Sequence, residues 1–289
     1  MMSERQKFAL VTGCGQGGIG EALVLEYKRR GIYAIATLLP QESSEHLDKE
    51  KITWFPLNVT EDESILKFKE KLLEITGGYL DILVNNAGIC YTMTAIDTNV
   101  QSVERMFDVN VFGPMRMVHH LHGMLIRSSG TIVSIGSIGG IVPYVYGSSY
   151  NASKAALQHW TNTLRLEMAP FNVKVLMIIS GEVGTNILKG DQNRELPPDS
   201  YFSPLASEFK QHVQRTPKTT SRFAYAETVV TQSLKSAPPA WFWTGSATRI
   251  IRFLDTFAFR TVWDYIFWSD FHFGKLQKAH ALRESDKTR

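Results

Sequence analysis

Short, apolar, β-rich runs alternate with longer helical patterns along most of this 289-residue chain, and this alternation limits its possible folds more than any other feature. The first run, KFALVT at residues 7–12, is followed by a helical pattern from Ile19 to Arg30. Later β-rich runs lie at residues 32–37, 52–59, 81–88, 130–137 and 172–180, with helical patterns at 62–75, at 110–126 and from about Tyr150. Strands that are separated by helices run parallel. We therefore predict an α/β fold with a doubly wound parallel sheet.

The pattern predicts a single domain over residues 1–248 and a C-terminal helical extension over 249–289. A short run, AWFWTG at 240–245, is a candidate seventh strand, so a boundary placed before it would cut the sheet. Residues 184–224 lose regular periodicity and include the proline-rich stretch ELPPDSYFSPL. Long irregular stretches in compact domains are usually functional or disordered. We expect a substrate loop here.

Composition and charge exclude several classes of function. The 31 basic and 28 acidic residues nearly cancel, so the strong field of a nucleic-acid-binding protein is missing. Two cysteines, Cys14 and Cys90, provide no disulfide framework, and a reducing, cytoplasmic compartment is expected. The N-terminus lacks the apolar stretch of a secretory signal, and charged residues interrupt every run of about 18 residues that could span a membrane.

A glycine-rich turn, VTGCGQGGIGEAL, joins the first strand to the first helix. Glycine permits a tight turn and a close approach to a pyrophosphate, and a helix N-terminus offers unpaired N–H groups with a partial positive charge. Gly13, Gly18 and Gly20 are the candidates for these roles, with Ile19 opening the helix beside them. The alternative is a glycine-rich turn that binds no ligand.

The end of the second strand normally selects between the two nicotinamide dinucleotides. A carboxylate there holds the ribose hydroxyls of NAD, whereas an arginine accepts the extra phosphate of NADP. Here the positions are Thr37, Leu38 and Leu39, so neither determinant is present. Without an acidic group a 2′-phosphate is not repelled, which favours NADP(H) over NAD(H). A Lys or Arg from elsewhere in the fold would supply the countercharge.

Tyr150 and Lys154 are four residues apart, so on a helix they project from one face. A phenol, with a pKa near ~10, is a poor acid–base catalyst at neutral pH, but a nearby ammonium favours the phenolate and lowers its pKa. Tyr150 would then protonate a carbonyl oxygen, and Ser137, at the end of the fifth strand, could hold the same oxygen. Ligands gather at the carboxyl ends of parallel strands. The alternative is a chance combination at an ordinary helix start.

Over residues 7–245 the combined motifs resemble the short-chain dehydrogenase/reductase family, whose marks are a TGxxxGxG turn, NNAG, a helix asparagine, a serine and YxxxK. The resemblance implies a Rossmann fold and NAD(P)-dependent interconversion of a ketone and a secondary alcohol. It implies that Asn110 supports a water in a proton relay and that Ser137 orients the substrate carbonyl. Tyr150 exchanges the proton, and Lys154 tunes Tyr150 and binds the nicotinamide ribose. The other implied cofactor contacts are Asn58 and Val59 near the adenine, Asn86, Ala87 and Gly88 beside the cofactor, and Val183 and Thr185 near the carboxamide.

Two features depart from the usual family pattern. The turn TGCGQGGIG is one residue longer, and Ser180-Gly181 replaces the common Pro-Gly after the sixth strand. The longer turn, the IGSIGG run and the aromatic tail are similar to fungal reductases such as 1-acyl-dihydroxyacetone-phosphate reductase, and to tailoring reductases of secondary metabolism. The family resemblance also implies a homodimer or homotetramer.

Two further signals lie outside these motifs. His119, His120 and His122 are close in sequence, but no carboxylate or cysteine nearby completes a metal site, so no metal is predicted. From Arg249 to Trp268, apolar and aromatic residues recur at helical spacing beside arginines. Such a helix either lies at a membrane surface, here that of the endoplasmic reticulum or a lipid droplet, or packs as a lid or subunit contact, which we favour.

Together these features predict an NADP(H)-dependent reductase that acts on a bulky, lipophilic ketone or the matching alcohol, such as acyl-dihydroxyacetone phosphate or a secondary metabolite. The alternative is a dinucleotide sensor or scaffold with the same fold and no turnover.

Overall fold

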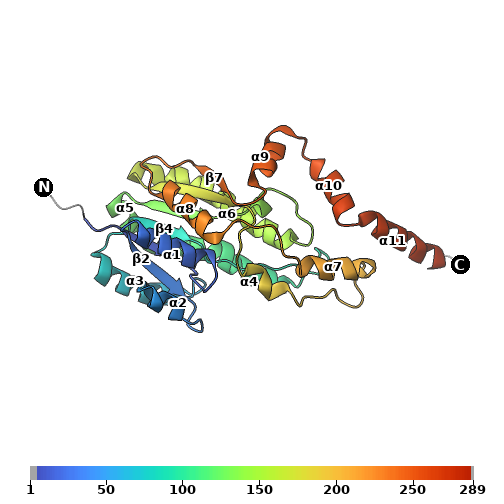
Figure 1. Ribbon diagram of the computed structural model, residues 1–289, viewed down its shortest axis with the longest axis horizontal. Helices are drawn as coiled ribbons and strands as arrows, with labels where there is room; N and C mark the ends of the chain where they lie inside the picture. The colour runs from blue at the N-terminus through green and yellow to red at the C-terminus, as the bar shows by residue number, and fades with distance from the viewer. Residues whose placement is uncertain (1–4, 288–289) are drawn as a thin grey trace.

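The computed structural model describes residues 5–287, so the last two residues of the predicted extension lie outside the described part. Its centre is a parallel, seven-stranded sheet in the order β3-β2-β1-β4-β5-β6-β7 (Figure 1). The strands are β1 (Phe8–Val11), β2 (Tyr33–Leu38), β3 (Thr53–Pro56), β4 (Ile82–Asn85), β5 (Thr131–Ile135), β6 (Lys174–Ser180) and β7 (Trp241–Thr244). The order reverses between β1 and β4, and the loops beyond their carboxyl ends part to leave a crevice there. The predicted doubly wound fold, including its seventh strand, is confirmed.

Helices cover both faces of the sheet through two apolar clusters. On one face α1 (Ile19–Arg29), α2 (Glu45–Lys49) and α8 (Arg222–Ser233) pack against the strands. On the other face lie α3 (Asp62–Thr76), α5 (Gly113–Ser128) and α6 (Ser148–Met168). Because both faces are covered, the strands are buried and read as continuous apolar runs. Only the carboxyl edge of the sheet is left for a ligand.

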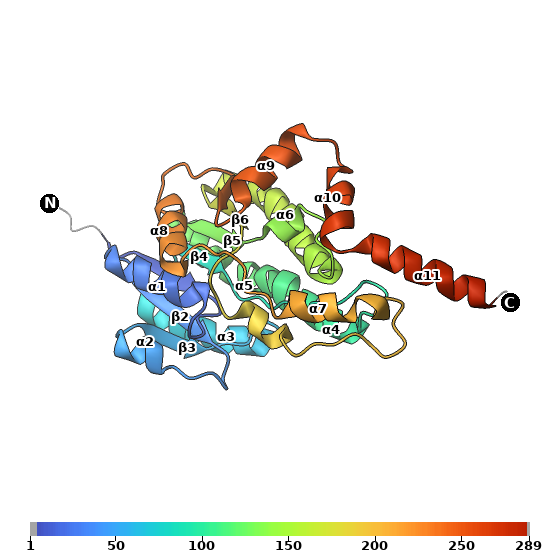
Figure 2. The ribbon, with the colours of Figure 1, turned by 45° about the vertical axis from the view of Figure 1, so that its right-hand side comes forward.

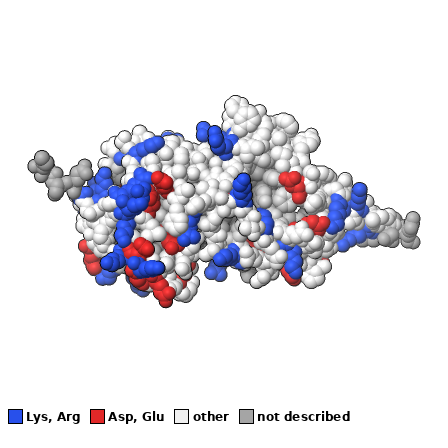
Figure 3. Space-filling model, viewed as in Figure 1, with Lys and Arg blue, Asp and Glu red and all other residues white. Residues whose placement is uncertain are grey.

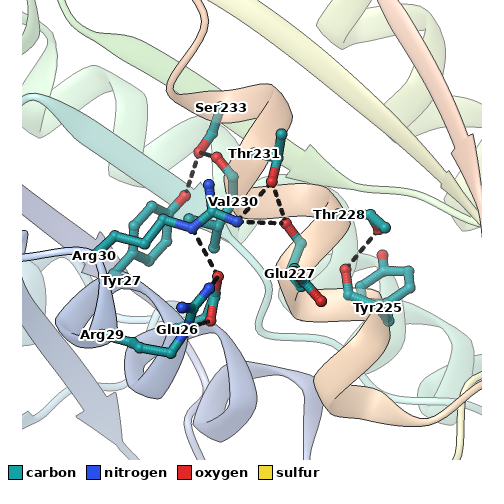
Figure 4. Close-up of polar contacts among 10 residues, drawn as sticks. All are labelled: Glu26, Tyr27, Arg29, Arg30, Tyr225, Glu227, Thr228, Val230, Thr231 and Ser233. Atoms are coloured by element: carbon teal, nitrogen blue, oxygen red, sulfur yellow. Dashed lines mark hydrogen bonds and ion pairs between the residues drawn. The ribbon is translucent and has the colours of Figure 1, made fainter.

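Polar contacts clamp α8 onto α1 (Figure 4). The Tyr27 hydroxyl, fully buried, lies 2.8 Å from the Ser233 hydroxyl. Arg30 donates to the Thr231 hydroxyl at 2.7 Å and to a carboxylate oxygen of Glu26 at 2.7 Å. The sequence patterns did not predict α8, which depends on this packing against α1 for its place. Its fixed position matters because the N-terminal residue of α8, Arg222, reaches the cavity described below.

The helix predicted at 110–126 begins earlier than expected. Helix α4 (Val100–Phe107) leads into a π-helical turn over Asp108–Phe112, and α5 follows directly. The Asn99 side chain caps α4 by accepting a hydrogen bond from the Ser102 N–H at 2.9 Å. This cap was readable from the sequence as a helix start. The π-helical turn was not, because it depends on how the chain packs around Asn110.

Residues 184–224 are irregular in part. Short 3₁₀ turns occupy Ile187–Asp191 and Ser203–Leu205, in agreement with the predicted loss of periodicity. The prediction is wrong for α7 (Ala206–Val213), a helix of two turns whose Phe209 and Val213 are buried. Packing, rather than a cap, sustains this helix, since its first residue has no side-chain cap.

The C-terminal extension is helical, as predicted, with α9 (Thr248–Phe257), α10 (Val262–Asp270) and α11 (Phe273–Lys287). Figures 1 and 2 show α9 and α10 against the body of the molecule and α11 projecting away from the sheet. Ile251 and Trp263 are buried together with Val142. The inner faces of α9 and α10 thus pack on the protein itself. No described helix is long and apolar enough to cross a membrane.

The histidines of α5 lie on the α3 side of the sheet. His120 Nε2 is 2.5 Å from Asp62 Oδ1, and His122 Nδ1 contacts the carbonyl oxygen of His119. The fold brings α3 against α5 and so places the Asp62 carboxylate beside His120, a contact that the sequence patterns did not indicate. Within residues 5–287 no three His, Cys, Asp or Glu side chains group as metal ligands would.

Candidate active site

Tyr150 and Lys154 lie in the first two turns of α6 and reach the same space beyond the carboxyl end of β5. The Lys154 Nζ donates to the carbonyl oxygen of Ile135 at 3.0 Å and lies 5.7 Å from the centroid of the Tyr150 ring. Ser137 follows β5 in extended backbone, and its hydroxyl accepts from the Gly139 N–H at 3.0 Å. The structure therefore brings the predicted Ser, Tyr and Lys together.

Burial controls the protonation of these groups. Burial raises the pKa of Tyr150 well above its usual value, the Cys90 thiolate raises it further, and a hydrogen bond with Ser137 lowers it. Burial lowers the pKa of Lys154 to about 8. The predicted lowering of the Tyr150 pKa is thus wrong for this site, because desolvation of the phenolate dominates and the Lys154 ammonium bonds to the main chain instead.

Asn110 lies behind the reacting centre and does not line it. It sits in the π-helical turn and is fully buried. Its amide group bonds to both main-chain groups of Ile89, at 2.8 and 2.9 Å, and donates to the Ser153 hydroxyl at 3.1 Å. The side chain joins the loop after β4 to α6, which positions Tyr150 and Lys154. The water that Asn110 is predicted to support stays a prediction.

A buried threonine locks the glycine-rich turn to the NNAG segment. The Thr12 hydroxyl accepts from the main-chain N–H groups of Asn86 and Ala87, both at 3.0 Å. The Asn86 amide donates to the carbonyl oxygens of Thr12 and Gly13. Gly13 has φ +68°, and a Cβ there would lie 2.8 Å from the Ala87 Cα, so only glycine fits. Asn85, by contrast, ends β4 with a buried amide that has no hydrogen-bond partner within residues 5–287.

These segments enclose a cleft of about 710 Å³ at the carboxyl edge of the sheet. Most of the predicted site residues line it: Gly13, Gly18, Ile19, Asn58, Val59, Asn86, Ala87, Gly88, Ser137, Tyr150, Lys154, Val183 and Thr185. Gly20 does not, because it packs inward, where a Cβ would lie 2.4 Å from the Gly13 carbonyl oxygen. In the longer turn, Gly15 and Gln16 also face the cleft. The glycine-rich turn and the Ser, Tyr and Lys therefore line one site.

Residues 7–196 match the model of the short chain dehydrogenase family, which covers most of the chain. The chain belongs to this family. Short-chain dehydrogenase virD of Hypocrea virens is 72% identical over 279 residues, which cover 96% of this chain and 97% of the relative. The NADPH-dependent 1-acyldihydroxyacetone phosphate reductase of Schizosaccharomyces pombe is 41% identical over 184 residues, covering 64% and 62%. The predicted resemblance to fungal members is confirmed.

Solved structures agree with this assignment. A short-chain dehydrogenase from Streptomyces avermitilis superposes with a TM-score of 0.75 at 26% identity and covers 94% of this chain and 99% of its own. A serine dehydrogenase complexed with NADP⁺ gives a TM-score of 0.69 at 25% identity, with 83% and 95% covered. This short-chain dehydrogenase is therefore an NAD(P)-dependent oxidoreductase with a Rossmann fold.

An acidic residue lies at the dinucleotide-selecting end of this short-chain dehydrogenase. Glu42 accepts from the Leu39 N–H at 2.7 Å, just beyond β2, and its other oxygen lies 2.9 Å from where a Gly15 Cβ would be. The expectation of no acidic group is thus wrong, because the chain turns at Pro40 and returns Glu42 to the cleft. Of the lysines and arginines, Arg105 and Lys154 line the same cleft.

A second cavity, of about 670 Å³, opens beside Tyr150 in this short-chain dehydrogenase. It shares Ser137, Tyr150 and residues 181, 183 and 185–187 with the cleft. Its other walls come from residues 90–92 and 138–147, the rest of the loop from residue 181 to 222, and α9 and α10. The sequence patterns missed its main side chains, Tyr144, His212, Arg215, Trp263 and Phe267. In the sequence, only the aromatic content of the tail and the irregularity of the loop indicated that these segments form part of a site.

The two departures from the family pattern have structural reasons. Ser180 ends β6 and bonds through its hydroxyl to the buried hydroxyl of Tyr225 on α8. Gly181 cannot be larger, because a Cβ would lie 1.9 Å from the Ser246 carbonyl oxygen. In the longer turn, Gly17 has φ +77° and contacts Asn186, whose amide donates to the Gln16 carbonyl oxygen at 3.1 Å. The longer turn thus bonds to the substrate loop.

Proposed function

We propose that this protein is an NADP(H)-dependent carbonyl reductase that acts on a lipophilic substrate. One observation carries the proposal: Ser137 and Tyr150 line both cavities, so a ligand in either one reaches the same two hydroxyls. The cleft leads from the glycine-rich turn to Tyr150, and the second cavity leads from Tyr150 to the aromatic residues of the extension. This is the arrangement that a hydride transfer between two bound molecules needs.

The geometry of the cleft supports the binding of a dinucleotide. Gly18, the N-cap residue of helix α1, provides no side-chain cap, so N–H groups of the first turn of the helix are available to a pyrophosphate. Gly13 provides the close backbone approach. NADP(H) is supported by the NADPH-dependent relative and by the NADP⁺ complex of the serine dehydrogenase. Binding of a 2′-phosphate would require the exposed Glu42 side chain to turn away from the Leu39 N–H.

The chemistry follows from the protonation states of the site. A bound reduced dinucleotide supplies the hydride. Because its pKa is raised, Tyr150 keeps its proton at neutral pH and can donate it to the developing alkoxide oxygen. Ser137, which hydrogen-bonds to Tyr150, holds the same oxygen. With a pKa of about 8, Lys154 is mostly protonated at pH 7 and places a positive charge beside the phenol as the proton leaves.

The second cavity supports a lipophilic substrate. Its walls include Val142, Ile251, Trp263 and Phe267, which belong to segments far apart in the sequence. Large apolar cavities with a few polar groups bind small organic molecules. The fungal relatives, including the 1-acyldihydroxyacetone phosphate reductase, are compatible with a lipid or secondary-metabolite ketone. We also propose that the protein forms a homodimer or homotetramer, which sedimentation of the purified chain would test.

The Tyr150→Phe variant tests this function. Removal of the phenolic proton should lower kcat by about 10²- to 10⁴-fold with NADPH and a panel of lipophilic ketones, while NADPH binding measured by fluorescence is retained. Tyr265→Phe is the matched control, since Tyr265 is exposed on α10 outside both cavities. Equal turnover in the native protein and Tyr150→Phe would contradict the proposal. Cofactor binding without any turnover by the native protein would favour the sensor alternative.

A further inference from the structure

Arg215 gives the substrate cavity a positive charge at the start of the loop that follows α7. One guanidinium nitrogen donates to the His212 carbonyl oxygen at 2.8 Å and lies 2.9 Å from His212 Nε2. Its Cζ lies 5.7 Å from the centroid of the Tyr144 ring. Tyr144 and His212 line the cavity with it. The guanidinium is thus held by neutral groups of the cavity wall, and its remaining N–H donors are not used by these contacts.

Arg215 has no acidic partner among the described residues, although it is half-buried. Arg222, in the same cavity wall, lies 3.4 Å from a Glu21 carboxylate oxygen. Arg194, at the base of the loop, lies 2.6 Å from an Asp191 carboxylate oxygen. A cation that is partly removed from water is costly unless an anion or several acceptors compensate it. Arg215 is therefore the wall arginine whose charge is left for a ligand.

Arg215 also changes the pKa of titratable groups around the cavity. Arg215 counteracts the burial that raises the pKa of Tyr144, and it lowers the pKa of Cys90, which burial raises to about 11. Burial lowers the pKa of His212 to about 3, with a smaller contribution from Arg215, so His212 adds no charge. Glu182 is the acidic wall residue, and it raises the pKa of both Tyr144 and Tyr150. An anion is consequently favoured beside Arg215 and disfavoured beside Glu182.

We infer that Arg215 binds an oxyanion on the substrate, so that the substrate class is a lipophilic carbonyl compound that also bears a carboxylate or phosphate. This inference rests on the proposed function. The carbonyl would meet Tyr150 and Ser137, the apolar body would lie against Trp263 and Phe267, and the oxyanion would meet the guanidinium. A planar guanidinium forms paired hydrogen bonds with either kind of oxyanion, which fixes orientation as well as affinity.

The test compares matched ketones with and without the anion: 7-oxooctanoate, its methyl ester, and 7-oxooctyl phosphate. For the native protein with NADPH, kcat/KM should be at least about tenfold higher for an anionic ketone than for the ester. The difference should arise from a lower KM for the anionic ketone. Comparison of 7-oxooctanoate with 7-oxooctyl phosphate shows whether the site prefers a carboxylate or a phosphate. Equal kcat/KM for all three ketones in the native protein would overturn the inference.

Variants of Arg215 separate binding from folding. In Arg215→Gln, kcat/KM for the anionic ketones should fall to the value for the methyl ester in the same variant, whereas Arg215→Lys should keep part of the preference. Lys210→Gln, an exposed α7 residue outside the cavity, is the charge-matched control and should keep the full preference. A preference that persists in Arg215→Gln would assign the anion to another residue. Absence of turnover on all three ketones by the native protein would count against the proposed function instead.

Discussion

The cofactor cleft and the substrate cavity meet at Tyr150 and Ser137 but are built in different ways. The cleft is made of turns at the ends of strands, and short-range backbone requirements fix it, such as the positive φ of Gly13. The substrate cavity is made of side chains from the loop 181–222 and from α9 and α10, which fold back from the C-terminal region (Figure 2). The first is set by the fold, and the second is set by packing between distant segments. Function is therefore divided, with common chemistry in one half and selectivity in the other.

The largest effect is expected at the junction of the two halves, in Lys154→Met. We expect kcat to fall by about 10²- to 10⁴-fold, because the positive charge beside Tyr150 is lost. The same variant should be more stable than the native protein at pH 7. Burial lowers the Lys154 pKa from 10.5 to about 8, so folding penalises the ammonium form. The penalty is complete below pH 8 and disappears above 10.5, the pKa before burial.

Urea unfolding without cofactor measures this difference in the free energy of unfolding. The Met variant should gain roughly 2 kcal/mol at pH 7, after about 1 kcal/mol is lost with the hydrogen bond to Ile135, and the gain should shrink as pH rises towards 10. A Met variant that is less stable than the native protein at pH 7 would show that the ammonium is well solvated in the fold.

The substrate half alone should respond to Trp263→Ala. Trp263 is buried in the cavity wall, and its removal leaves a large void where the substrate body packs. We expect KM for a bulky ketone to rise about tenfold, with KM for NADPH unchanged. Trp268→Ala on the same helix is the control, because Trp268 is half-exposed and lines neither cavity. A parallel rise in both KM values would mean that the two halves do not act separately.

This difference in construction also explains what the sequence could predict. The strands, the glycine-rich turn, and the positions of Ser137, Tyr150 and Lys154 follow from local pattern and motif, and the structure brings them together. The pKa of Tyr150 could not be predicted, because helical spacing puts Lys154 on the same face but does not say how deeply the phenol is buried.

Other residues were missed because their partners are far away in the sequence. Thr12 acts through N–H groups 74 and 75 residues later. Arg215 and Trp263 become wall residues only when the loop and the extension fold over the IGSIGG segment. Glu42 is close in sequence to the end of β2, but the turn after Leu39 is what brings its side chain back to the cleft. The periodicity of a sequence does not show which segments the turns of the chain bring together.

A smaller effect is expected in the cofactor half from Glu42→Gln. The native carboxylate occupies the Leu39 N–H and would repel a 2′-phosphate. We expect kcat/KM for NADPH relative to NADH to rise about fivefold, an exposed-charge effect of roughly 1 kcal/mol. Glu45→Gln, exposed on α2 outside the cleft, is the control. A relative loss of NADH activity without a gain for NADPH would instead identify Glu42 as a ligand of the NAD ribose.

The outer face of the extension contrasts with its inner, substrate-lining face. Ile250, Phe253 and Phe257 on α9 are exposed by 62%, 61% and 76%. Figure 3 shows few charged side chains over this part of the surface. The basic residues Arg249 and Arg252 border it on the same helix. Exposed aromatic residues beside arginines are typical of helices that rest on an anionic bilayer surface. We propose such a peripheral contact, through which a lipophilic substrate would reach the cavity.

Deletion of the extension cannot test this contact, because it would also remove the cavity wall formed by Ile251, Trp263 and Phe267. The outward-facing pair Phe253→Ser and Phe257→Ser leaves that wall in place. Co-flotation with anionic liposomes should fall about threefold in the double variant and should fall in the native protein as salt is raised, while activity on a water-soluble ketone is kept. Phe171→Ser, half-exposed outside the extension, serves as the control. If flotation is unchanged while the double variant loses self-association, the exposed face is a contact between copies of the chain, and the outer half of the extension serves assembly.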